Sequence, residues 1–480
     1  MSSVKRDQWS KRFGVWFRQV LRNASVMDYR YPIKGCGVWL PYGFKIRRKV
    51  LGTLRDLLDS TEHEETLFPL LIPETSLAKE AGHVGSFEAQ CLWVTHGGLE
   101  PLKVKYALRP TSETAIAPML KLWIRSHADL PMRLYQIVNI FRYETRATRP
   151  ILRMREVSTF KEAHTAHATR KEAEAQVTTG VKIYKQFFDA MGVPYLTSRR
   201  PEWDKFPGAL YSIAFDMICP DGRSLQIGTV HNLGQNFSKA FDISYETEAG
   251  EQKHIWQTCY GISGRGIASA LIAHGDDHGI VLPPAIAPIQ VVVVPVPYGG
   301  MEGTINSACE DATARLRHAN LTVKLDLRPD LTPGSKFYYW ELRGIPVRVE
   351  IGPRDVENNE ATIVRRDTLT RQTCKTDELE DVVIELLETM TVDLKAKAWR
   401  WIRKHVYRVD NLSRAKQLLK DRAGVVEVFW CGRDECGRNL EEEVNARVLG
   451  VPEDVEGEID GQCILCGRKA VQLVRLAQAY

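Results

Sequence analysis

The chain has 480 residues, enough for two or three domains, and 44% of them are hydrophobic, an ordinary share for a globular protein. The 65 basic and 60 acidic residues leave a formal net charge of +5, which is compatible with a polyanionic partner only at a local patch. No apolar run approaches the roughly 20 residues that cross a bilayer, and the first residues lack the apolar core of a secretory signal, so we expect a cytoplasmic protein.

The first part of the chain mixes helical stretches with short strand-like segments. Residues 43–73 predict a helix that leads into a strand containing Pro69, and LYQIVNIFRYE at 134–144 predicts a second strand. Residues 171–192 predict a helix that ends at Gly192, because glycine is common at helix C-termini.

Five arginines crowd into sixteen residues, FRYETRATRPILRMRE, at 141–156. We expect a strand, a loop at 145–152 and a returning strand. Because side chains on a strand alternate with a period of two, one face of this hairpin should display Arg142, Glu144, Phe160, Glu162 and His164. Guanidinium groups bind phosphates in pairs of hydrogen bonds and stack on planar rings. By itself, the run is also compatible with a solvated face or a nucleic-acid patch.

A proline-rich seam, LPPAIAP at 282–288, separates this region from a different pattern. Beyond it strands and helices alternate, which predicts a compact α/β module with a parallel or mixed sheet. The predicted strands are 289–296, 321–327, 345–351 and 360–366, and the predicted helices are 302–319 and 335–343. A charged helical stretch at 377–405 then leads to the C-terminal tail.

Four of the ten cysteines form two close pairs in that tail, Cys431 with Cys436 and Cys463 with Cys466. In a reducing compartment, clustered thiols indicate a metal site rather than disulfides. Four thiolates make a closed tetrahedral site without a position for water, so the predicted role of Zn²⁺ is structural. The alternative is four unrelated buried cysteines. Among the other cysteines only Cys259 stands out, through its neighbouring motif.

Three stretches together resemble the motifs of class II aminoacyl-tRNA synthetases. Residues 43–73 resemble motif 1, the arginine hairpin resembles motif 2, and TCYGISGRGIASALIAHGDDHGIVLPP at 258–284 resembles motif 3. Further stretches resemble the prolyl-tRNA synthetases of archaeal and eukaryotic type: RPTSETAI (109–116), FKEAHT (160–165), KFPGA (205–209) and LQIGTVHNLGQNF (225–237). The resemblance covers nearly the whole chain.

The resemblance implies an α/β (α+β) chain of three domains. These are a class II catalytic domain on an antiparallel sheet (1–284), an α/β anticodon-binding domain (285–396) and a small C-terminal zinc-binding α+β domain (397–480). It implies a ligase that uses ATP and Mg²⁺ to convert L-proline to prolyl-adenylate and pyrophosphate, and then transfers proline to the 3′ end of tRNA(Pro). It also implies a homodimer formed through motif 1.

The functional residues of the family carry over onto matching positions. Thr111 and Glu113 are expected to hold the imino group of proline, whose two N–H donors suit a hydroxyl and a carboxylate. Arg142 and Arg265 are expected to be catalytic, with Arg142 between the proline carboxylate and the α-phosphate. The implied proline pocket is Thr111, Glu113, Arg142, Phe160, Glu162, His164, Phe206, His231 and Ser263. The implied ATP site is Arg142, Glu144, Arg153, Gln226, Thr229, Gln257, Thr258 and Arg265.

Two details of the second motif depart from the family pattern or stay open. Either Arg153 or Arg155 can be the arginine of the returning strand that faces ATP, and we favour Arg153. The chain also has one residue more than the pattern before Phe160, which implies a β-bulge in that strand.

The anticodon is expected to contact the α/β module. Arg348, Glu350 and Arg354 are the candidates for base contacts, and other basic residues there, Lys336, Arg343, Arg365 and Arg366, are candidates for phosphates. Ordinary surface charge is the alternative for each of them. The C-terminal Tyr480 resembles a tail that returns toward the catalytic domain.

Only about 95 residues separate motifs 2 and 3, which leaves no room for a large inserted editing domain. Because missing methylenes discriminate by only about 1–3 kcal/mol, misactivation of alanine or cysteine is expected. The rival interpretations are a related synthetase for threonine, serine, glycine or histidine, and a catalytically silent paralogue that binds RNA. A threonine enzyme would need zinc in the catalytic pocket, whereas the paired cysteines lie in the tail. Retention of Arg142, Glu144 and Arg265 argues against the silent paralogue.

Overall fold

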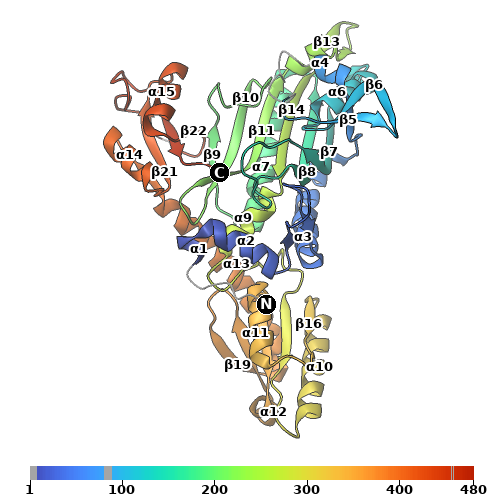
Figure 1. Cartoon of the computed structure of the whole chain (residues 1–480), viewed down its shortest axis with the longest axis vertical. Helices are drawn as coiled ribbons and strands as arrows, with labels where there is room; N and C mark the ends of the chain where they lie inside the picture. Colours follow the sequence, from blue (N-terminus) through green and yellow to red (C-terminus); the bar gives the residue numbers. More distant parts are fainter. Residues whose placement is uncertain (1–7, 80–88, 456, 458) are drawn as a thin grey trace.

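The computed structural model describes residues 8–79, 89–455, 457 and 459–480. Figure 1 shows three parts: a large sheet with its helices in the upper half, a second sheet with helices below it, and the C-terminal part beside the large sheet. Among the described residues, no helix combines the length and the apolar character needed to cross a membrane.

The large sheet dominates the first part of the chain. Its strands there are β3 (Glu64–Glu65), β7 (Met132–Phe141), β8 (Glu156–His167), β9 (Leu196–Arg199), β10 (Tyr211–Ile218), β11 (Ser224–Gly234) and β14 (Trp256–Ser263). They lie in the order β9-β10-β11-β14-β8-β7-β3, and all neighbours are antiparallel except β3 with β7. The predicted antiparallel sheet is confirmed.

Helices cover one face of this sheet. They are α1 (Gln8–Lys11), α2 (Phe13–Asn23), α3 (Pro41–Asp59), α7 (Arg170–Ala190) and α9 (Arg265–His274). Trp16, Tyr184 and Phe187 belong to the core between them and the sheet. Helix α7 is the one predicted at 171–192: the Thr169 side chain accepts from the Glu172 N–H at its start, and Gly192 follows its end with φ +64°. The opposite face of the sheet is left to line a cavity.

Smaller elements frame the end of the sheet near β7. A three-stranded sheet, β4-β6-β5, combines β4 (Leu71–Pro73), β5 (Leu92–Gly97) and β6 (Glu100–Leu108), and α4 (Glu74–Lys79) and α6 (Glu113–Trp123) lie beside it. The remaining short pieces are β1 (Met27–Asp28), β2 (Val38–Trp39), α8 (Asn236–Ala240), β12 (Ser244–Glu246) and β13 (Gln252–His254). In the motif 1 stretch the predicted helix is α3, while the single predicted strand is divided between β3 and β4.

The α/β module that the sequence predicts is built on the second sheet. Its strands are shorter than predicted, and it has one additional strand. The strands are β15 (Val291–Pro295), β16 (Val323–Leu325), β17 (Val347–Ile351), β18 (Glu360–Arg365) and β19 (Arg371–Lys375), and the helices are α10 (Glu302–His318), α11 (Pro333–Leu342) and α12 (Pro353–Asn358). The order is β16-β15-β17-β18-β19, parallel over the first three strands and antiparallel over the rest, so the sheet is mixed. All of β15 is buried, as suits a strand with parallel neighbours on both sides.

A long helix, α13 (Leu379–Lys404), connects this module to the C-terminal part and spans the predicted boundary at 396–397. The C-terminal part contains β20 (Val406–Arg408), α14 (Leu412–Lys420), β21 (Val425–Trp430), α15 (Asp434–Val444), β22 (Arg447–Pro452) and β23 (Gln472–Ala477). Strand β22 pairs with β9, so the order β20-β21-β23-β22 continues directly into the large sheet and completes its eleven strands. The sequence did not predict this continuation.

Candidate active site

A cavity of about 340 Å³ opens on the face of the large sheet that the helices leave free. Strands β7, β8, β11 and β14, the loop after β7 and the segment before β10 contribute its walls. The predicted site residues among its lining are Thr111, Glu113, Arg142, Glu144, Arg153, Phe160, Glu162, Phe206, Gln226, Thr229, His231, Ser263 and Arg265. Residues from positions 111 to 265 of the sequence therefore converge on one space.

The β7–β8 hairpin forms as predicted, with one change at its tip. Strand β7 ends at Phe141, so Arg142 and Glu144 follow the strand instead of lying on it. The Tyr143 N–H turns away from β8 to donate to the Gln90 carbonyl, which explains why regular pairing stops there. On β8 one residue is additional, because Val138 pairs with Phe160 but Ile140 pairs with Val157. The predicted bulge is present.

One end of the cavity is small, buried and partly aromatic. Thr111 and Glu113 lie where α6 begins, and the Thr111 hydroxyl donates to the Glu113 carboxylate. The rings of Phe206 and His231 lie 4.9 Å apart, and His231 Nδ1 is 2.7 Å from the Ser212 hydroxyl. Burial lowers the pKa of His231 to about 4, so this ring is neutral at neutral pH and adds no charge to the pocket.

Two carboxyl groups share this end, and their pKa values move apart. Burial, together with the charge of Glu113, raises the pKa of Glu162 to about 7. Burial alone would also raise the pKa of Glu113, but His164 and the Thr111 hydroxyl more than offset it, so the net shift is downward. Glu113 is therefore the anion at neutral pH. An ionised Glu113 beside a partly protonated Glu162 and apolar and aromatic walls suits a small cationic ligand.

The other end of the cavity is cationic. Burial and the nearby charges of Arg153 and Arg142 lower the pKa of Arg265 to about 10. Arg265 Nε donates to the Leu152 carbonyl at 2.8 Å, which holds the side chain in the cavity wall. Three guanidinium groups that repel one another bind an anion of several charges well, because the anion removes the repulsion.

The structure distinguishes the two arginines that the sequence left open. Arg153 lines the cavity, and its Nε lies 3.8 Å from a Glu144 carboxylate oxygen. Arg155 stacks over the Tyr143 ring at 4.3 Å and donates to the Glu144 carbonyl, and it is not among the lining residues. This geometry favours Arg153.

Three predicted residues lie outside the cavity lining. His164 is directly behind it, with Nε2 3.9 Å from the sulfur of Cys259. Gln257 and Thr258 lie near the start of β14, whereas Ser263 is at its end, roughly 20 Å away at the rise of an extended strand. The Thr258 hydroxyl is bonded to the Thr165 hydroxyl at 2.6 Å. Gln257 and Thr258 are therefore at the end of β14 where Cys259 lines the cavity, far from Ser263 and Arg265, and are not among the lining residues themselves.

Sequence reasoning missed Arg200, which is buried in the cavity wall. Its Nη2 donates to both Asp216 carboxylate oxygens, at 2.9 and 3.1 Å, and to Gln226 Oε1 at 2.9 Å. Its Nη1 donates to the Leu449 carbonyl on β22 at 2.6 Å. No motif surrounds this arginine in the sequence. Its contact with Leu449 forms only because β22 pairs with β9.

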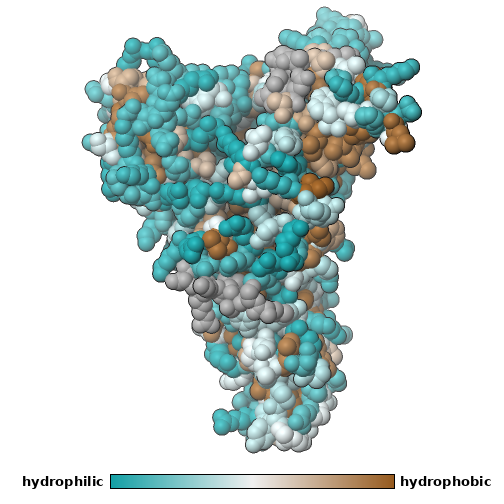
Figure 2. Space-filling view, viewed as in Figure 1, coloured by the Kyte–Doolittle hydropathy of each residue, from teal (hydrophilic) through white to brown (hydrophobic). Residues whose placement is uncertain are grey.

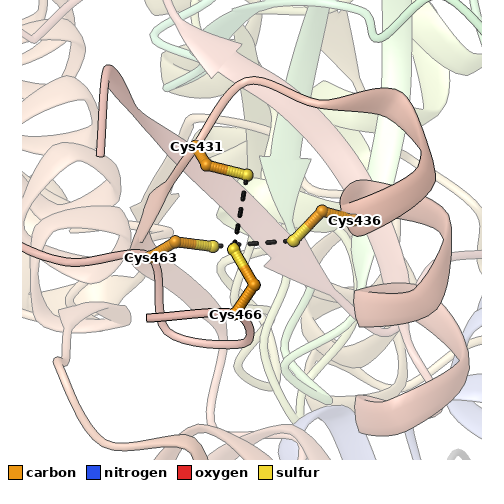
Figure 3. A group of neighbouring side chains, drawn as sticks. All are labelled: Cys431, Cys436, Cys463 and Cys466. Carbon is orange, nitrogen blue, oxygen red and sulfur yellow. Dashed lines mark hydrogen bonds between the residues drawn. The ribbon is translucent and has the colours of Figure 1, made fainter. Parts of the chain in front are cut away.

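The four predicted cysteines meet in one cluster in the C-terminal part. Figure 3 shows their side chains pointing toward a common centre from the end of β21, from α15 and from the loop before β23. The sulfurs of Cys436 and Cys463 are 3.6 Å apart, those of Cys431 and Cys466 are 3.7 Å apart, and all four thiols are free. A tetrahedral zinc site with bonds of about 2.3 Å separates its sulfurs by about 3.8 Å. The cluster therefore fits a zinc ion.

The candidates for anticodon contacts differ in exposure. Arg354 is exposed at the start of α12, whereas Glu350 is buried between Arg348, at 2.8 Å, and Arg371. Four further basic residues for which phosphate contacts are predicted are buried and donate to groups of their own chain: Lys336, Arg343, Arg365 and Arg366.

The C-terminal Tyr480 does return to the large sheet. Its ring lies between the guanidinium groups of Arg149 and Arg223, 4.6 and 4.5 Å from the ring centre. Its hydroxyl donates to Asp221 at 2.7 Å, and its N–H donates to the Ser224 carbonyl. Arg149 belongs to the loop of the arginine hairpin, so Tyr480 connects that loop to the strand at 224.

Three family descriptions match the chain in consecutive segments. Residues 94–274 match the tRNA synthetase class II core domain (G, H, P, S and T), and residues 290–386 match an anticodon binding domain. Residues 412–480 match the C-terminal domain of prolyl-tRNA synthetases.

Full-length relatives and solved structures agree with these segments. The chain is 54% identical to a proline--tRNA ligase of Methanopyrus kandleri over 98% of this chain and 96% of that one, and 50% identical to one of Pyrococcus horikoshii over 99% and 100%. It is similar to Giardia lamblia prolyl-tRNA synthetase in complex with prolyl-adenylate, with a TM-score of 0.95 and 35% identity over 100% and 99% of the two chains. The chain is also similar to the prolyl-tRNA synthetase of Cryptosporidium parvum complexed with halofuginone and AMPPNP, with a TM-score of 0.95 and 31% identity over 100% and 99% of the two chains.

Proposed function

This chain belongs to the proline--tRNA ligases, the prolyl-tRNA synthetases of archaeal and eukaryotic type, and on that premise we propose how its residues divide the work. L-proline, ATP and tRNA(Pro) are the substrates of this ligase activity. The observation that carries the assignment of residues is one cavity with a single carboxylate at one end and three arginines at the other.

Proline occupies the small end of the cavity. Its secondary ammonium group donates to the Glu113 carboxylate and the Thr111 hydroxyl, while Phe160, Phe206 and His231 enclose the ring. The anionic state of Glu113 supports this placement. Glu162 and His164 tune that state, Glu162 by being partly protonated at neutral pH and His164 through its proximity.

ATP occupies the cationic end. Arg142 lies between the two ends and bridges the proline carboxylate and the α-phosphate, where the carboxylate attacks and pyrophosphate leaves. Arg153 and Arg265 bind the phosphates, Glu144 accepts from the adenine amine, and Gln226, Thr229 and Ser263 complete the wall. Mg²⁺ accompanies ATP and neutralises part of the phosphate charge. The 3′-terminal hydroxyl of tRNA then attacks the activated carbonyl of prolyl-adenylate.

ATP–pyrophosphate exchange with each of the twenty amino acids tests this assignment. Exchange should be strongest with proline, and Arg142→Ala should suppress it. Arg146→Ala is the matched control, because Arg146 is exposed in the same loop and outside the cavity lining. Near-normal exchange by Arg142→Ala would contradict the role of Arg142.

The same assay tests selectivity. Alanine and cysteine fit a pocket built for proline, and their rejection depends on missing methylenes that discriminate by about 1–3 kcal/mol. We therefore expect measurable exchange with both. If neither supports exchange, the pocket excludes small substrates by a contact that this assignment lacks.

Outside the cavity, the four-cysteine cluster binds Zn²⁺ in a structural role, connecting the loop before β23 to the start of α15. The exposed Arg354 contacts the anticodon, with Arg348 and the buried Glu350 as the further candidates beside it, and the enzyme acts in the cytoplasm. Two copies associate through motif 1, where Leu67, Pro69, Leu70 and Leu71 are exposed close together. Figure 2 shows apolar side chains gathered near β7 on this side of the molecule. The molar mass in solution tests the dimer.

A further inference from the structure

Three buried side chains of different chemistry meet in the floor of the proline pocket, and the proposed reaction does not use one of them, Cys259. The sulfur of Cys259 lies 3.3 Å from Glu113 Oε1 and 3.9 Å from His164 Nε2. The three atoms lie within 4.8 Å of one another, and all three residues are buried. A thiol, an imidazole and a carboxylate at such distances are the ligand set of a transition-metal site.

The separations match a metal ion bound at the centre of the group. A tetrahedral ion with bonds of about 2.0–2.3 Å separates its ligand atoms by about 3.5 Å. The two measured separations, 3.3 and 3.9 Å, lie on either side of that value. Small side-chain movements therefore suffice to place all three atoms at bonding distance.

Rigid elements hold the three ligands in place. His164 and Cys259 are directly paired residues of the neighbouring strands β8 and β14, and Glu113 lies in the first turn of α6. Glu113 and Cys259 both line the cavity, so an ion has a route from solvent and its fourth position faces the space assigned to proline. This site therefore resembles an open three-ligand arrangement rather than the closed four-cysteine cluster.

The protonation states support binding of a soft ion and its dependence on pH. Burial lowers the pKa of His164 although Glu113 opposes the shift, which favours the unprotonated imidazole that a metal ion requires. Burial and the charges of Glu113 and Glu162 raise the pKa of the Cys259 thiol well above its usual value. An ion that binds the thiolate must displace a proton, so binding weakens as the pH falls.

We propose that Glu113, His164 and Cys259 bind one thiophilic divalent cation, Zn²⁺ or Cd²⁺, and that this ion and L-proline exclude each other. The exclusion rests on the proposed function, because it assigns Glu113 to the imino group of proline. A carboxylate that coordinates the ion no longer accepts from that group, and the ion places positive charge where the ammonium would lie. Such an ion is therefore a competitive inhibitor with respect to proline.

Metal binding tests the site directly. The full-length enzyme, with its four-cysteine cluster already filled with zinc, is titrated with Zn²⁺ against a chromophoric chelator in the absence of ATP and proline. Wild type should bind one equivalent more than Cys259→Ser, with the affinity at that site falling by on the order of 100-fold or more, since even outer partners of metal ligands contribute 10–100-fold. Equal binding by the two proteins would overturn the site. His164→Gln gives the same comparison if Cys259→Ser does not fold.

Displacement separates this inference from the proposed function. Saturating L-proline should release the additional equivalent, whereas D-proline at the same concentration should not. If the ion binds in wild type but stays in the presence of L-proline, the exclusion fails, and the assignment of Glu113 to proline fails with it. If exchange by Arg142→Ala is lost but no additional ion binds, only the metal site fails.

The kinetics give a second measurement. In pyrophosphate exchange Zn²⁺ should raise the KM for proline and leave kcat unchanged, with each protein compared to its own rate without added metal. The increase in KM should disappear in Cys259→Ser. Equal inhibition of both proteins, or a fall in kcat alone, would overturn competition at this site.

Discussion

The two modules that follow the large sheet in the sequence are attached to it in different ways. The C-terminal module continues the sheet itself, because β22 pairs with β9 through Val451 and Pro452. The anticodon-binding module has its own sheet and its own core. It meets the catalytic part through the ion pair of Arg366 with Asp276, at 2.7 and 2.8 Å, and through backbone hydrogen bonds from the Ile280 and Leu282 N–H groups to the carbonyls of Leu342 and Gly344. The first attachment makes one continuous sheet, and the second joins two separate sheets by contacts between loops and helices.

The difference shows which module belongs to the framework of the active site. Both attachments include an arginine, Arg200 with the Leu449 carbonyl and Arg366 with Asp276, but Arg200 also holds Gln226 of the cavity wall. Arg366 and Asp276 are not among the lining residues. A substitution that destabilises the C-terminal module should therefore also weaken ATP binding. A substitution at the other attachment should affect only the steps that need the whole tRNA.

The largest effect is expected from Arg200→Ala. The substitution leaves Asp216 buried without its partner, which typically costs about 3–5 kcal/mol, and it frees Gln226. We expect a lower urea midpoint and a higher KM for ATP in pyrophosphate exchange. Arg447→Ala is the control, because its ion pair with Asp204 crosses the same junction but is exposed and contributes at most about 1 kcal/mol. Equal effects of the two variants would contradict the role of Arg200.

Removal of zinc should have the next largest effect. A chelator, or Cys463→Ser, should lower the melting temperature and, through β22, also the rate of exchange, because the cluster ties the loop before β23 to α15. Cys374→Ser changes a half-buried thiol of the anticodon-binding module and should leave both unchanged. If zinc-free protein still catalyses exchange at the full rate, the loss of zinc from the C-terminal module does not affect the active site through the shared sheet.

A smaller effect is expected from Arg366→Ala. Asp276 is partly exposed, so losing its charged hydrogen bonds should cost about 2 kcal/mol. Exchange should be unchanged while charging of tRNA(Pro) slows. Arg315→Ala, which breaks a surface ion pair within the module, should alter neither rate. Slower exchange by Arg366→Ala would remove the contrast between the two attachments.

The smallest expected effect is on how the stability of the protein changes at acid pH. Burial alone would raise the pKa of Asp276, but Arg366 outweighs it and the net shift is downward from 3.8. This stabilisation is present above about pH 4 and is lost as the pH falls through the lowered pKa. Burial raises the pKa of Asp216 despite Arg200, so protonation there favours the folded state, and that contribution is lost as the pH rises.

The two aspartates should therefore give opposite slopes. The stability of wild type minus that of Asp276→Asn should fall as the pH is lowered from 5 toward 3. The stability of wild type minus that of Asp216→Asn should rise over the same range. Urea unfolding at each pH measures both differences, and parallel slopes would contradict the contrast.

Local patterns carried most of what the sequence predicted correctly. The arginine hairpin, its bulge, the helix before Gly192 and the alternating module all depend on neighbouring residues, and each is present. The resemblance named Glu113 and Arg265 as members of one site, although they are far apart in the chain, because it supplied long-range information that periodicity does not contain.

The failures share a physical cause, which is pairing between distant segments. Arg200 becomes important only because Leu449 lies beside it, and nothing in the local sequence encodes that approach. Arg365 and Arg366 look like exposed cations in sequence, yet their side chains are buried and pair with the partly exposed aspartates Asp393 and Asp276 from elsewhere in the chain.

The pairing of β22 with β9 also has a consequence for association between molecules. A strand at the edge of a sheet presents unpaired N–H and carbonyl groups, which attract strands of other chains. Strand β9 would be such an edge if β22 were missing, because among the described strands it otherwise pairs only with β10. The C-terminal module therefore protects the catalytic sheet from edge-to-edge aggregation, in addition to supporting its active site.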